Sequence, residues 1–355
     1  MASDGSDLGT MDYKCICLTT PGSFTRKLEV GKNVKPGKGY ALVKTGFVGV
    51  CGTDYHAFGG NQPLFSYPRV LGHELGVTVV ALGADCDDAG VNVGDNCAVE
   101  PYFHCGKCIA CRRGKTNCCT SIEVLGVHID GGLCSHFLCP VGKLHPSATL
   151  PLDVLALVET LCIGAHAVFR GQVEANEWAL VVGAGPIGMA ASQFAMAEGA
   201  NVIAIDIDDG RLAFIKEKVG VLHTLNARSP TILDEITAIC GGDLPTTVFE
   251  ATGNIHSMKK SFEFVAHGGK LVFIGHTKLQ VEYHNPLFHS REMTIMGSRN
   301  ALGSDFKRTI KLIEDGKVDV TPWITHRCTY DDFEENFAEW LKPETGVIKA
   351  VVSME

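Results

Sequence analysis

A glycine turn between an apolar strand and a helix restricts the possible folds of this chain more than any other stretch. Gly183-Ala-Gly185-Pro186-Ile187-Gly188 follows the apolar run Ala179-Leu-Val-Val182 and opens a helical pattern. In such a turn the first glycine permits a tight bend, the second lets a pyrophosphate approach, and the third permits close helix–strand packing. Free N–H groups at the helix start then face the phosphates. The stretch therefore predicts a dinucleotide-binding site.

Strand-like and helical segments alternate around this turn. Helical patterns at Ile187–Glu198 and Ile232–Cys240 separate apolar runs of strand length. Alternation of this kind predicts a parallel sheet with helices on both faces. The expected strands are Trp178–Gly183, Val202–Asp206, Thr246–Glu250, Lys270–Gly275 and Met293–Ser298.

The acidic residue that closes the second of these strands indicates which nucleotide is bound. Asp206 lies about twenty residues beyond the glycine turn, where a carboxylate accepts hydrogen bonds from the ribose hydroxyls. It would repel a 2′-phosphate, which favours NAD over NADP. Arg211 follows closely and is the one nearby feature that opposes this preference.

The chain before residue 150 has a different pattern of apolar residues. Short strand-like runs such as Tyr40–Lys44 and Gly76–Val80 are broken by Gly and Pro, which predicts a barrel-like β domain. A helical pattern from Asp153 to Gly171 connects it to the alternating region. With 355 residues, the chain is long enough for two domains. We expect the tail after Ser298, a helical segment followed by short strands, to return to the first domain.

The stretch from Cys51 to Glu74 concentrates groups that bind metals and move protons. Cys51-Gly-Thr53-Asp54-Tyr-His56 is followed by Gly72-His73-Glu74. A thiolate and an imidazole are typical zinc ligands, so we predict that Cys51 and His73 hold a catalytic zinc. The alternative is a cysteine that packs as a small hydrophobic side chain beside a structural histidine.

A second cysteine cluster has the spacing of a structural zinc site. Cys105, Cys108 and Cys111 recur at every third residue, and Cys118-Cys119 follows. Four thiolates leave a tetrahedral zinc no open position, which describes a site that braces a loop. An iron–sulfur cluster is the chemical alternative. Spacing alone leaves open whether Cys119 or Cys118 is the fourth ligand.

Composition excludes several other classes of protein. A net charge of -9 without a long basic run argues against nucleic acid as a partner. The uncharged stretch between Glu177 and Glu198 contains the glycine turn, so it is expected to be a strand, a turn and a helix and not a membrane span. The first ten residues predict a disordered lead without the apolar core of a signal peptide. Fifteen cysteines then favour free thiols or metal ligands and a cytoplasmic location.

These motifs, in this order, resemble the zinc-dependent medium-chain dehydrogenases/reductases, the alcohol and polyol dehydrogenase family. The resemblance covers nearly all of the chain after residue 10. It implies an α/β protein with a GroES-like β-barrel catalytic domain at 11–160, completed by 298–355, and a Rossmann NAD-binding domain at 161–297. It also implies two zinc ions per chain, NAD as cofactor, an active site between the domains, and a homodimer or homotetramer.

The resemblance also implies roles for individual residues. Cys51 and His73 match the family's catalytic zinc ligands, and Glu159 stands where the third ligand is expected. Cys162 and Glu74 remain alternatives for that third position, since Glu74 matches a residue that approaches the metal in some members. Asp54 matches the partner of the ligand histidine.

Proton transfer and substrate binding complete the expectation from the family. Thr53 matches the hydroxyl that takes the substrate proton, and His56 matches the relay to solvent. Arg299 is a candidate for contacts with cofactor phosphates or a substrate carboxylate, while His128 and Asp130 are candidates for polar substrate groups.

The segments Glu100–Cys105, Gly126–Gly132 and Met293–Asn300 resemble the sugar-alcohol and sugar-acid branch of the family. This resemblance implies oxidation of a secondary alcohol of a polyol or an L-galactonate-type sugar acid. The alternatives are a zinc dehydrogenase of another alcohol, such as threonine, butanediol or a simple alcohol, and a non-enzymatic nucleotide-binding protein.

Overall fold

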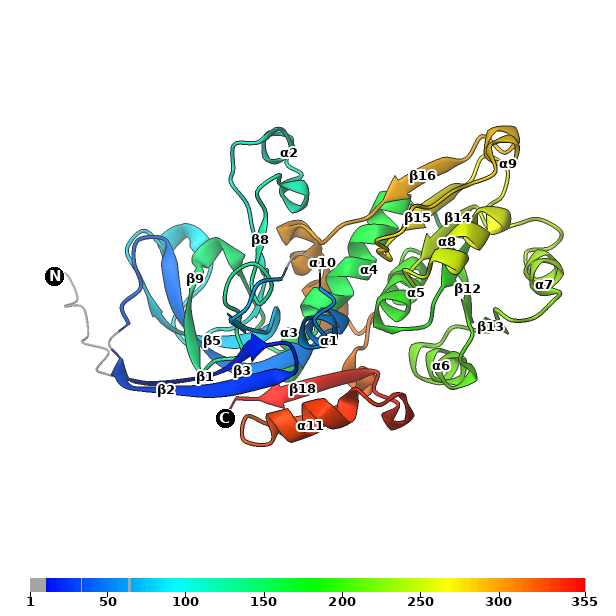
Figure 1. Ribbon diagram of the computed structural model, residues 1–355. Coiled ribbons are helices and arrows are strands. Elements are labelled where there is room, and N and C mark those ends of the chain that lie inside the picture. The colour runs from blue at the N-terminus through cyan, green and yellow to red at the C-terminus, as the bar shows by residue number, and fades with distance from the viewer. Residues whose placement is uncertain (1–10, 33, 63–64, 355) are drawn as a thin grey trace. The chain divides into compact units, whose positions relative to one another are not determined.

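The chain forms two compact units in the computed structural model, which describes residues 11–32, 34–62 and 65–354 (Figure 1). The first unit combines the described residues up to Glu159 with those from Ile324 onward. The second unit is the continuous segment Thr160–Trp323. The predicted disordered lead, residues 1–10, lies outside the described residues.

The first unit is built mainly from β-sheets, as expected for its short, turn-separated strands. β3 (Tyr40–Val50) is its central strand and is buried along most of its length because both faces pack against other elements. The larger sheet has the order β10-β6-β5-β3-β18-β17, and β9 also pairs with β3. The smaller sheet has the order β2-β1-β4. The remaining bounds are β1 Met11–Thr20, β2 Ser23–Lys32, β4 Arg69–Val70, β5 Glu74–Leu82, β6 Asn96–Val99, β9 His136–Pro140, β10 Leu144–Pro146, β17 Ile324–Thr329 and β18 Lys349–Ser353.

Short helices and a small hairpin connect these strands. The four-residue helix α2 lies in the loop between the two strands of the hairpin, β7 and β8. The bounds are β7 Tyr102–Phe103, β8 Glu123–Val124, α1 Gly52–Phe58, α2 Ile109–Arg112, α3 Leu152–Ala156, α4 Val158–Gly171 and α11 Phe333–Trp340. The connecting helix expected at 153–171 is thus interrupted at Leu157, between α3 and α4.

The tail returns to the first unit through pairing and aromatic packing. β18 pairs antiparallel with β3 and parallel with β17, so the C-terminal segment lies inside the larger sheet. The helix α11 buries Phe333 and Phe337. Their rings lie 5.1 and 5.2 Å from the ring of Phe24, at edge-to-face angles that aromatic rings favour.

The second unit has the predicted Rossmann fold. Six parallel strands have the order β13-β12-β11-β14-β15-β16, so the direction of winding reverses beside β11, the first strand of the unit. All five expected strands are present within a few residues of the predicted bounds, and β13 is an addition. The strands are β11 Trp178–Val182, β12 Asn201–Asp206, β13 His223–Asn226, β14 Thr247–Glu250, β15 Lys270–Phe273 and β16 Thr294–Gly297. The helices are α5 Pro186–Ala197, α6 Asp209–Phe214, α7 Ile232–Ile239, α8 Ile255–Lys260, α9 Asn285–Ser290 and α10 Gly303–Glu314.

The segment 298–323 lies in the second unit, whereas the sequence predicts it as part of the first domain. The reason is a set of contacts between α10 and α4. His166 Nδ1 lies 2.8 Å from Asp305 Oδ2, and Arg308 Nη2 donates to the carbonyl of Ala165 at 2.9 Å. The chain rejoins the first unit only at Ile324.

Within the part of the chain that the structure describes, no helix has both the length and the apolar character needed to cross a lipid bilayer. The uncharged stretch around Gly183 forms β11, the glycine turn and α5, as predicted.

The aromatic contacts of α11 generate a stability prediction. Phe337 is fully buried, so Phe337→Ala should lower the free energy of unfolding by about 3–5 kcal/mol through lost burial and a residual cavity. Leu341→Ala, at a neighbouring side chain that is 41% exposed, is the control and should change it far less. Urea denaturation measures both variants. Equal, small effects would contradict this role for α11 in the core.

Candidate metal and cofactor sites

The structure brings Cys51, His73 and Glu74 together. One ligand atom from each lies within 4.8 Å of the other two. Cys51 stands between β3 and α1, while His73 directly precedes β5, which Glu74 opens. Because β3 and β5 pair antiparallel with Gly49 opposite Glu74, the two chain segments meet at one place. Three donors in one cluster fit a zinc ion that keeps an open position.

Electrostatics at this cluster favour positive charge. Burial alone lowers the pKa of His73, but the negative charges of Cys51 and Asp54 outweigh it and raise the pKa well above its usual value. Asp54 Oδ1 lies 3.9 Å from His73 Nδ1, the geometry expected if this carboxylate orients the ligand histidine. Asp54 also accepts a hydrogen bond from the Cys51 N–H at 2.9 Å, which links the two residues at the start of α1. An environment that stabilises an imidazolium also suits a metal cation.

Lys349 is part of this cluster, although no sequence motif pointed to it. Its ammonium group donates to both carboxylate oxygens of Glu74 and, at 3.2 Å, to the carbonyl of Val50. Both side chains of the ion pair are buried, and the charge of Glu74 raises the pKa of Lys349 although burial lowers it. A Cβ atom at Gly49 would lie 2.2 Å from Glu74 Oε2, so the glycine leaves room for the carboxylate.

Glu159 is buried but lies outside the three-residue cluster. It is the second residue of α4, and its Oε1 accepts a hydrogen bond from the hydroxyl of Tyr102. Burial raises the pKa of Glu159 although the charge of His73 lowers it. Cys162, the alternative for the third position, is buried and donates to Thr309 Oγ1 at 3.5 Å. It is not part of a metal-binding group among the described residues.

The predicted proton-transfer pair lies on one short helix. Thr53 and His56 are three residues apart in α1, a spacing that places side chains on the same face. Thr53 is half-buried and His56 is exposed. Their positions fit a path from a buried site to solvent.

The other predicted zinc site is fully assembled. Cys105, Cys108, Cys111 and Cys119 offer sulfur atoms within 4.8 Å of one another, whereas Cys118 is exposed and lies outside the group. The sulfur pairs Cys108–Cys111 and Cys105–Cys119 are 3.4 and 3.5 Å apart. Zinc–sulfur bonds of about 2.3 Å place tetrahedral ligands about 3.8 Å apart, so a small expansion accommodates the ion.

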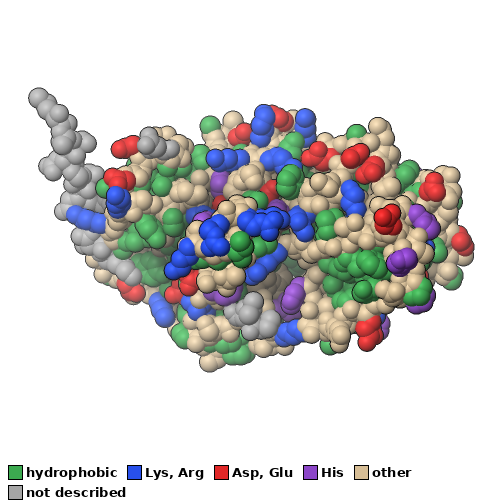
Figure 2. Space-filling model, turned by 90° about the horizontal axis from the view of Figure 1, so that it is seen from above, with side chains coloured by type: hydrophobic (Ala, Val, Ile, Leu, Met, Phe, Trp, Pro, Cys, Tyr) green, Lys and Arg blue, Asp and Glu red, His purple; other side chains and the backbone are tan. Residues whose placement is uncertain are grey.

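Backbone amides prepare this loop for metal binding. Hydrogen bonds from the N–H groups of Cys111 and Thr120 lower the pKa of Cys108 to about 5, and similar bonds lower the pKa of Cys105, whereas burial and the neighbouring thiols raise the pKa of Cys111 to about 12. Thiolates are the metal-binding form of cysteine. The loop also carries four exposed basic side chains, and Figure 2 shows Lys and Arg gathered on the face seen there. These four are Lys107, Arg112, Arg113 and Lys115.

The glycine turn has the geometry that its sequence predicts. Gly183 has φ +103°, which favours glycine, and a Cβ atom at Gly188 would lie 1.7 Å from the Gly183 carbonyl oxygen. At Gly185 the nearest atom to such a Cβ is Arg211 Nη1, at 3.8 Å, so the backbone is open to a ligand. Pro186 and Ile187 begin α5 here. The turn therefore fits a pyrophosphate at the helix N-terminus.

Asp206 closes β12 beside this turn. Its carboxylate accepts hydrogen bonds from the N–H groups of Ala184 at 2.7 Å and Asp208 at 3.0 Å. These bonds hold the carboxylate next to the glycine turn, the position that a ribose-binding residue requires. Arg299 is exposed after β16.

Two weaker candidates have structural partners. Asp130 accepts hydrogen bonds from the Val70 N–H at 3.0 Å and from Arg69 at 3.2 Å, so it braces β4. His128 Nδ1 accepts from the Val124 N–H at 3.1 Å. These contacts give both residues a role in loop structure.

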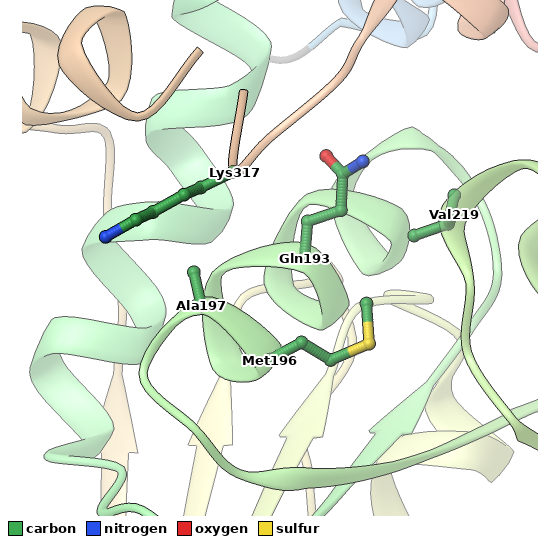
Figure 3. A pocket seen from close by; sticks show the side chains of 5 residues that line it. All are labelled: Gln193, Met196, Ala197, Val219 and Lys317. Carbon is green, nitrogen blue, oxygen red and sulfur yellow. The ribbon is translucent and has the colours of Figure 1, made fainter. Parts of the chain in front are cut away.

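A cavity of about 350 Å³ opens on the second unit (Figure 3). Gln193, Met196 and Ala197 contribute to it from the second half of α5, together with Val219 and Lys317. The glycine turn lies at the other end of this helix. No predicted site residue lines the cavity, which is therefore separate from the expected cofactor site.

Comparison with known proteins agrees with this geometry. Residues 37–150 match the alcohol dehydrogenase GroES-like domain, and residues 186–315 match the zinc-binding dehydrogenase family. The chain is 40% identical over 321 residues to the L-galactonate-5-dehydrogenase of Escherichia coli K12, which covers 90% of this chain and 93% of that protein.

Two solved structures share the whole fold. One is described as a short chain alcohol dehydrogenase from Escherichia coli CFT073 complexed with NADH, with a TM-score of 0.88, 28% identity, and coverage of 97% of this chain and 100% of that one. The other is described as a zinc-binding dehydrogenase from Sinorhizobium meliloti 1021 bound to NADP, with a TM-score of 0.87, 26% identity, and coverage of 96% and 99%. The protein therefore belongs to the zinc-dependent alcohol dehydrogenase family of medium-chain dehydrogenases/reductases and is an oxidoreductase.

Proposed function

We propose that this protein oxidises a secondary alcohol of a sugar acid of the L-galactonate type, or of a related polyol, with NAD as the acceptor. The observation that carries the proposal is the 40% identity, over nearly the whole chain, to a protein that acts on L-galactonate. The cluster of Cys51, His73 and Glu74 supports it because it offers the donors of a catalytic metal site.

The pairing of Glu74 with Lys349 favours Cys51, His73 and Glu159 as the catalytic zinc ligands. Because Lys349 already neutralises Glu74, the Cys51 thiolate and the Glu159 carboxylate are the anionic donors left for the metal. Asp54, the other buried carboxylate at this cluster, faces His73 and would orient that ligand. Tyr102 would release Glu159 Oε1 or share it with the metal. When bound, zinc supplies Lewis-acid chemistry that eases proton loss from an alcohol near neutral pH.

Residues of the protein would then carry the proton of the substrate hydroxyl to solvent. Thr53, half-buried on α1, would accept the proton of the substrate hydroxyl, and the exposed His56 on the same helix face would pass it to water. Asp54 would hold His73 in the ring orientation that ligation requires. Arg299 would bind a cofactor phosphate or the substrate carboxylate.

Asp206 supports NAD as the preferred cofactor. Its carboxylate stands beside the glycine turn, where a 2′-phosphate would bring further negative charge. Arg211, near Gly185, would pair with the pyrophosphate in this arrangement. Arg211 is also the nearby group that would attract a 2′-phosphate.

We further propose a structural zinc on Cys105, Cys108, Cys111 and Cys119, which makes two zinc ions per chain. The fifteen free cysteines support a cytoplasmic location, where thiols remain reduced. The family resemblance supports a homodimer or homotetramer.

The substrate class is tested with a panel of aldonates, polyols, L-threonine, 2,3-butanediol and simple alcohols. We expect the highest kcat/KM with L-galactonate or a closely related sugar acid, and higher kcat/KM with NAD than with NADP. Absorbance of the reduced nicotinamide measures both. A clear preference for threonine or a simple alcohol would contradict the substrate proposal, and preference for NADP would contradict the role of Asp206.

The catalytic zinc is tested with Cys51→Ser. This variant should retain one zinc per chain against two in the wild type, lose turnover by at least about a hundredfold because the Lewis acid is absent, and still bind NADH. Metal analysis, activity and cofactor fluorescence measure the three quantities. Cys118→Ser is the matched control and should keep both ions. Activity that persists with one zinc per chain would refute the assignment.

The third ligand is tested by comparing Glu159→Gln with Cys162→Ala. Glu159→Gln should weaken retention of one zinc by about ten- to a hundredfold during dialysis against a chelator, since a charged ligand is lost. Cys162→Ala should retain both ions. The reverse pattern would identify Cys162 as the ligand, and loss of zinc in neither variant would leave Glu74 as the third donor.

A further inference from the structure

Glu250 is a completely buried carboxylate that no step of the proposed reaction uses. It is the last residue of β14, and its side chain has no measurable exposure. Oε1 accepts hydrogen bonds from the Thr252 N–H at 3.1 Å, from the Ser257 hydroxyl at 3.0 Å and from the Thr252 hydroxyl. Oε2 accepts from the Gly253 N–H at 3.2 Å. A buried charge is tolerated only when it is so fully bonded.

These bonds shape the turn that follows β14. The Thr252 hydroxyl also accepts a hydrogen bond from the Asn254 N–H at 3.0 Å, and Asn254 caps α8. The Glu250 carboxylate therefore holds the turn between β14 and α8, directly at Thr252 and Gly253 and through the Thr252 hydroxyl at Asn254.

The same turn touches the loops after both neighbouring strands. Thr252 Cγ2 lies 2.8 Å from where a Cβ atom at Gly183 would stand, so the turn packs against the cofactor glycine loop after β11. On the other side, a Cβ at Gly275 would lie 2.2 Å from the Gly253 nitrogen and 2.7 Å from Glu250 Oε2. Backbone N–H groups of Ile274 and Gly275 also donate to the Glu250 carbonyl, at 2.8 and 2.9 Å.

The location of this cluster is the reversal point of the sheet. Strand order changes direction between β11 and β14, and ligands of such sheets bind beyond the carboxyl ends of the strands at that point. Glu250 lies at the carboxyl end of β14, paired with Val182 at the end of β11. The turn that it holds thus lies beside the glycine loop at this reversal point.

We infer that Glu250 is a positioning residue for the nicotinamide dinucleotide: it holds the Thr252–Gly253 turn in the conformation that the cofactor requires. The inference rests on the proposed use of such a cofactor. The carboxylate acts by accepting from both backbone N–H groups of the turn at once, which fixes the orientation of two peptide planes.

Glu250→Gln tests this with almost no change of shape. The two backbone donors approach different oxygens, Thr252 on Oε1 and Gly253 on Oε2. Whichever way the amide is turned, its NH₂ group faces one of these N–H groups and a bond is lost. We expect the Kd for NADH and the KM for NAD to rise about tenfold or more, with kcat at saturating NAD within about threefold of the wild type.

A second readout needs no cofactor. Hydrogen exchange of the amides at 252 and 253 in the cofactor-free protein should be faster in Glu250→Gln than in the wild type, because these N–H groups lose an acceptor. Zinc content should remain at the wild-type value.

Control variants separate positioning from loss of stability. Ser257→Ala removes a donor to Glu250 that lies outside the turn, so it should raise the Kd for NADH much less than Glu250→Gln does. Glu100→Gln neutralises a buried carboxylate of the first unit, which contacts Lys143 and His145, and should lower the melting temperature without changing the Kd for NADH. Thr252→Val replaces the hydroxyl with a methyl group and should raise that Kd severalfold, while Thr252→Ser keeps the hydroxyl, loses only the Cγ2 that packs against Gly183, and should raise it less.

Unchanged NADH binding together with unchanged hydrogen exchange in Glu250→Gln would overturn the inference. A rise in the Kd for NADH that is the same in Glu250→Gln and in Glu100→Gln would also overturn it. If Glu250→Gln does not fold, Thr252→Val decides, and a wild-type Kd in that variant overturns the inference. A wild-type protein that binds neither NADH nor NADPH would instead overturn the proposed function, and the exchange measurement would still report whether Glu250 holds the turn.

Discussion

The buried ion pair between Glu74 and Lys349 is the interaction on which the first unit depends. The two residues are 275 positions apart in the sequence, yet the ammonium contacts both oxygens of the carboxylate. A third strand joins them through the Val50 carbonyl, so β3, β5 and β18 meet at this point. Removing one partner of a buried pair costs about 3–5 kcal/mol. Glu74, a member of the candidate metal cluster, is therefore neutralised only once the C-terminal strand has returned, which gives a physical reason for a first unit that is discontinuous in sequence.

In the second unit the corresponding constraint is steric. The Gly183 carbonyl oxygen occupies the space that a Cβ at Gly188 would need, and the Thr252 side chain reaches the edge of Gly183. Because glycine occupies positions 183 and 188, β11, α5 and the turn after β14 can pack closely against one another. Gly185 is the glycine of this turn whose backbone stays open to a ligand. A phosphate site thus arises from the same contacts that hold the strand and helix together.

Local motifs could be predicted from the sequence because their geometry depends on neighbouring residues. The glycine turn needs only its own strand and helix, and the fold class follows from the alternation around it. Contacts between distant segments could not be predicted in the same way. Lys349 carries no motif, and only the pairing of β18 with β3 reveals its place beside Glu74. Likewise, the spacing of Cys118 and Cys119 is compatible with either as a ligand, whereas the fold buries one sulfur in the cluster and exposes the other.

The error in the boundary at residue 298 has a similar origin. The amphipathic pattern of α10 shows that one of its faces is buried, but not against which unit. The pair of His166 and Asp305, which are 139 positions apart, settles that question in favour of α4. The edge strand β13 was missed because its four residues are only half-buried and lack an apolar run.

The two buried glutamates at the centre of these sites are compensated in different ways, and the difference bears on what each site can bind. Glu250 accepts hydrogen bonds from N–H and O–H groups, so its negative charge orients the dipoles of the turn around it. Glu74 is satisfied by a cation, so its charge is cancelled within the protein. The negative charge that remains near His73 then comes from Cys51, Asp54 and Glu159. If Lys349 were neutral, the cluster would hold one further negative charge, and Glu74 would be free to occupy the position that a substrate hydroxyl needs. Lys349 therefore favours a site that both holds a metal and keeps a coordination position open.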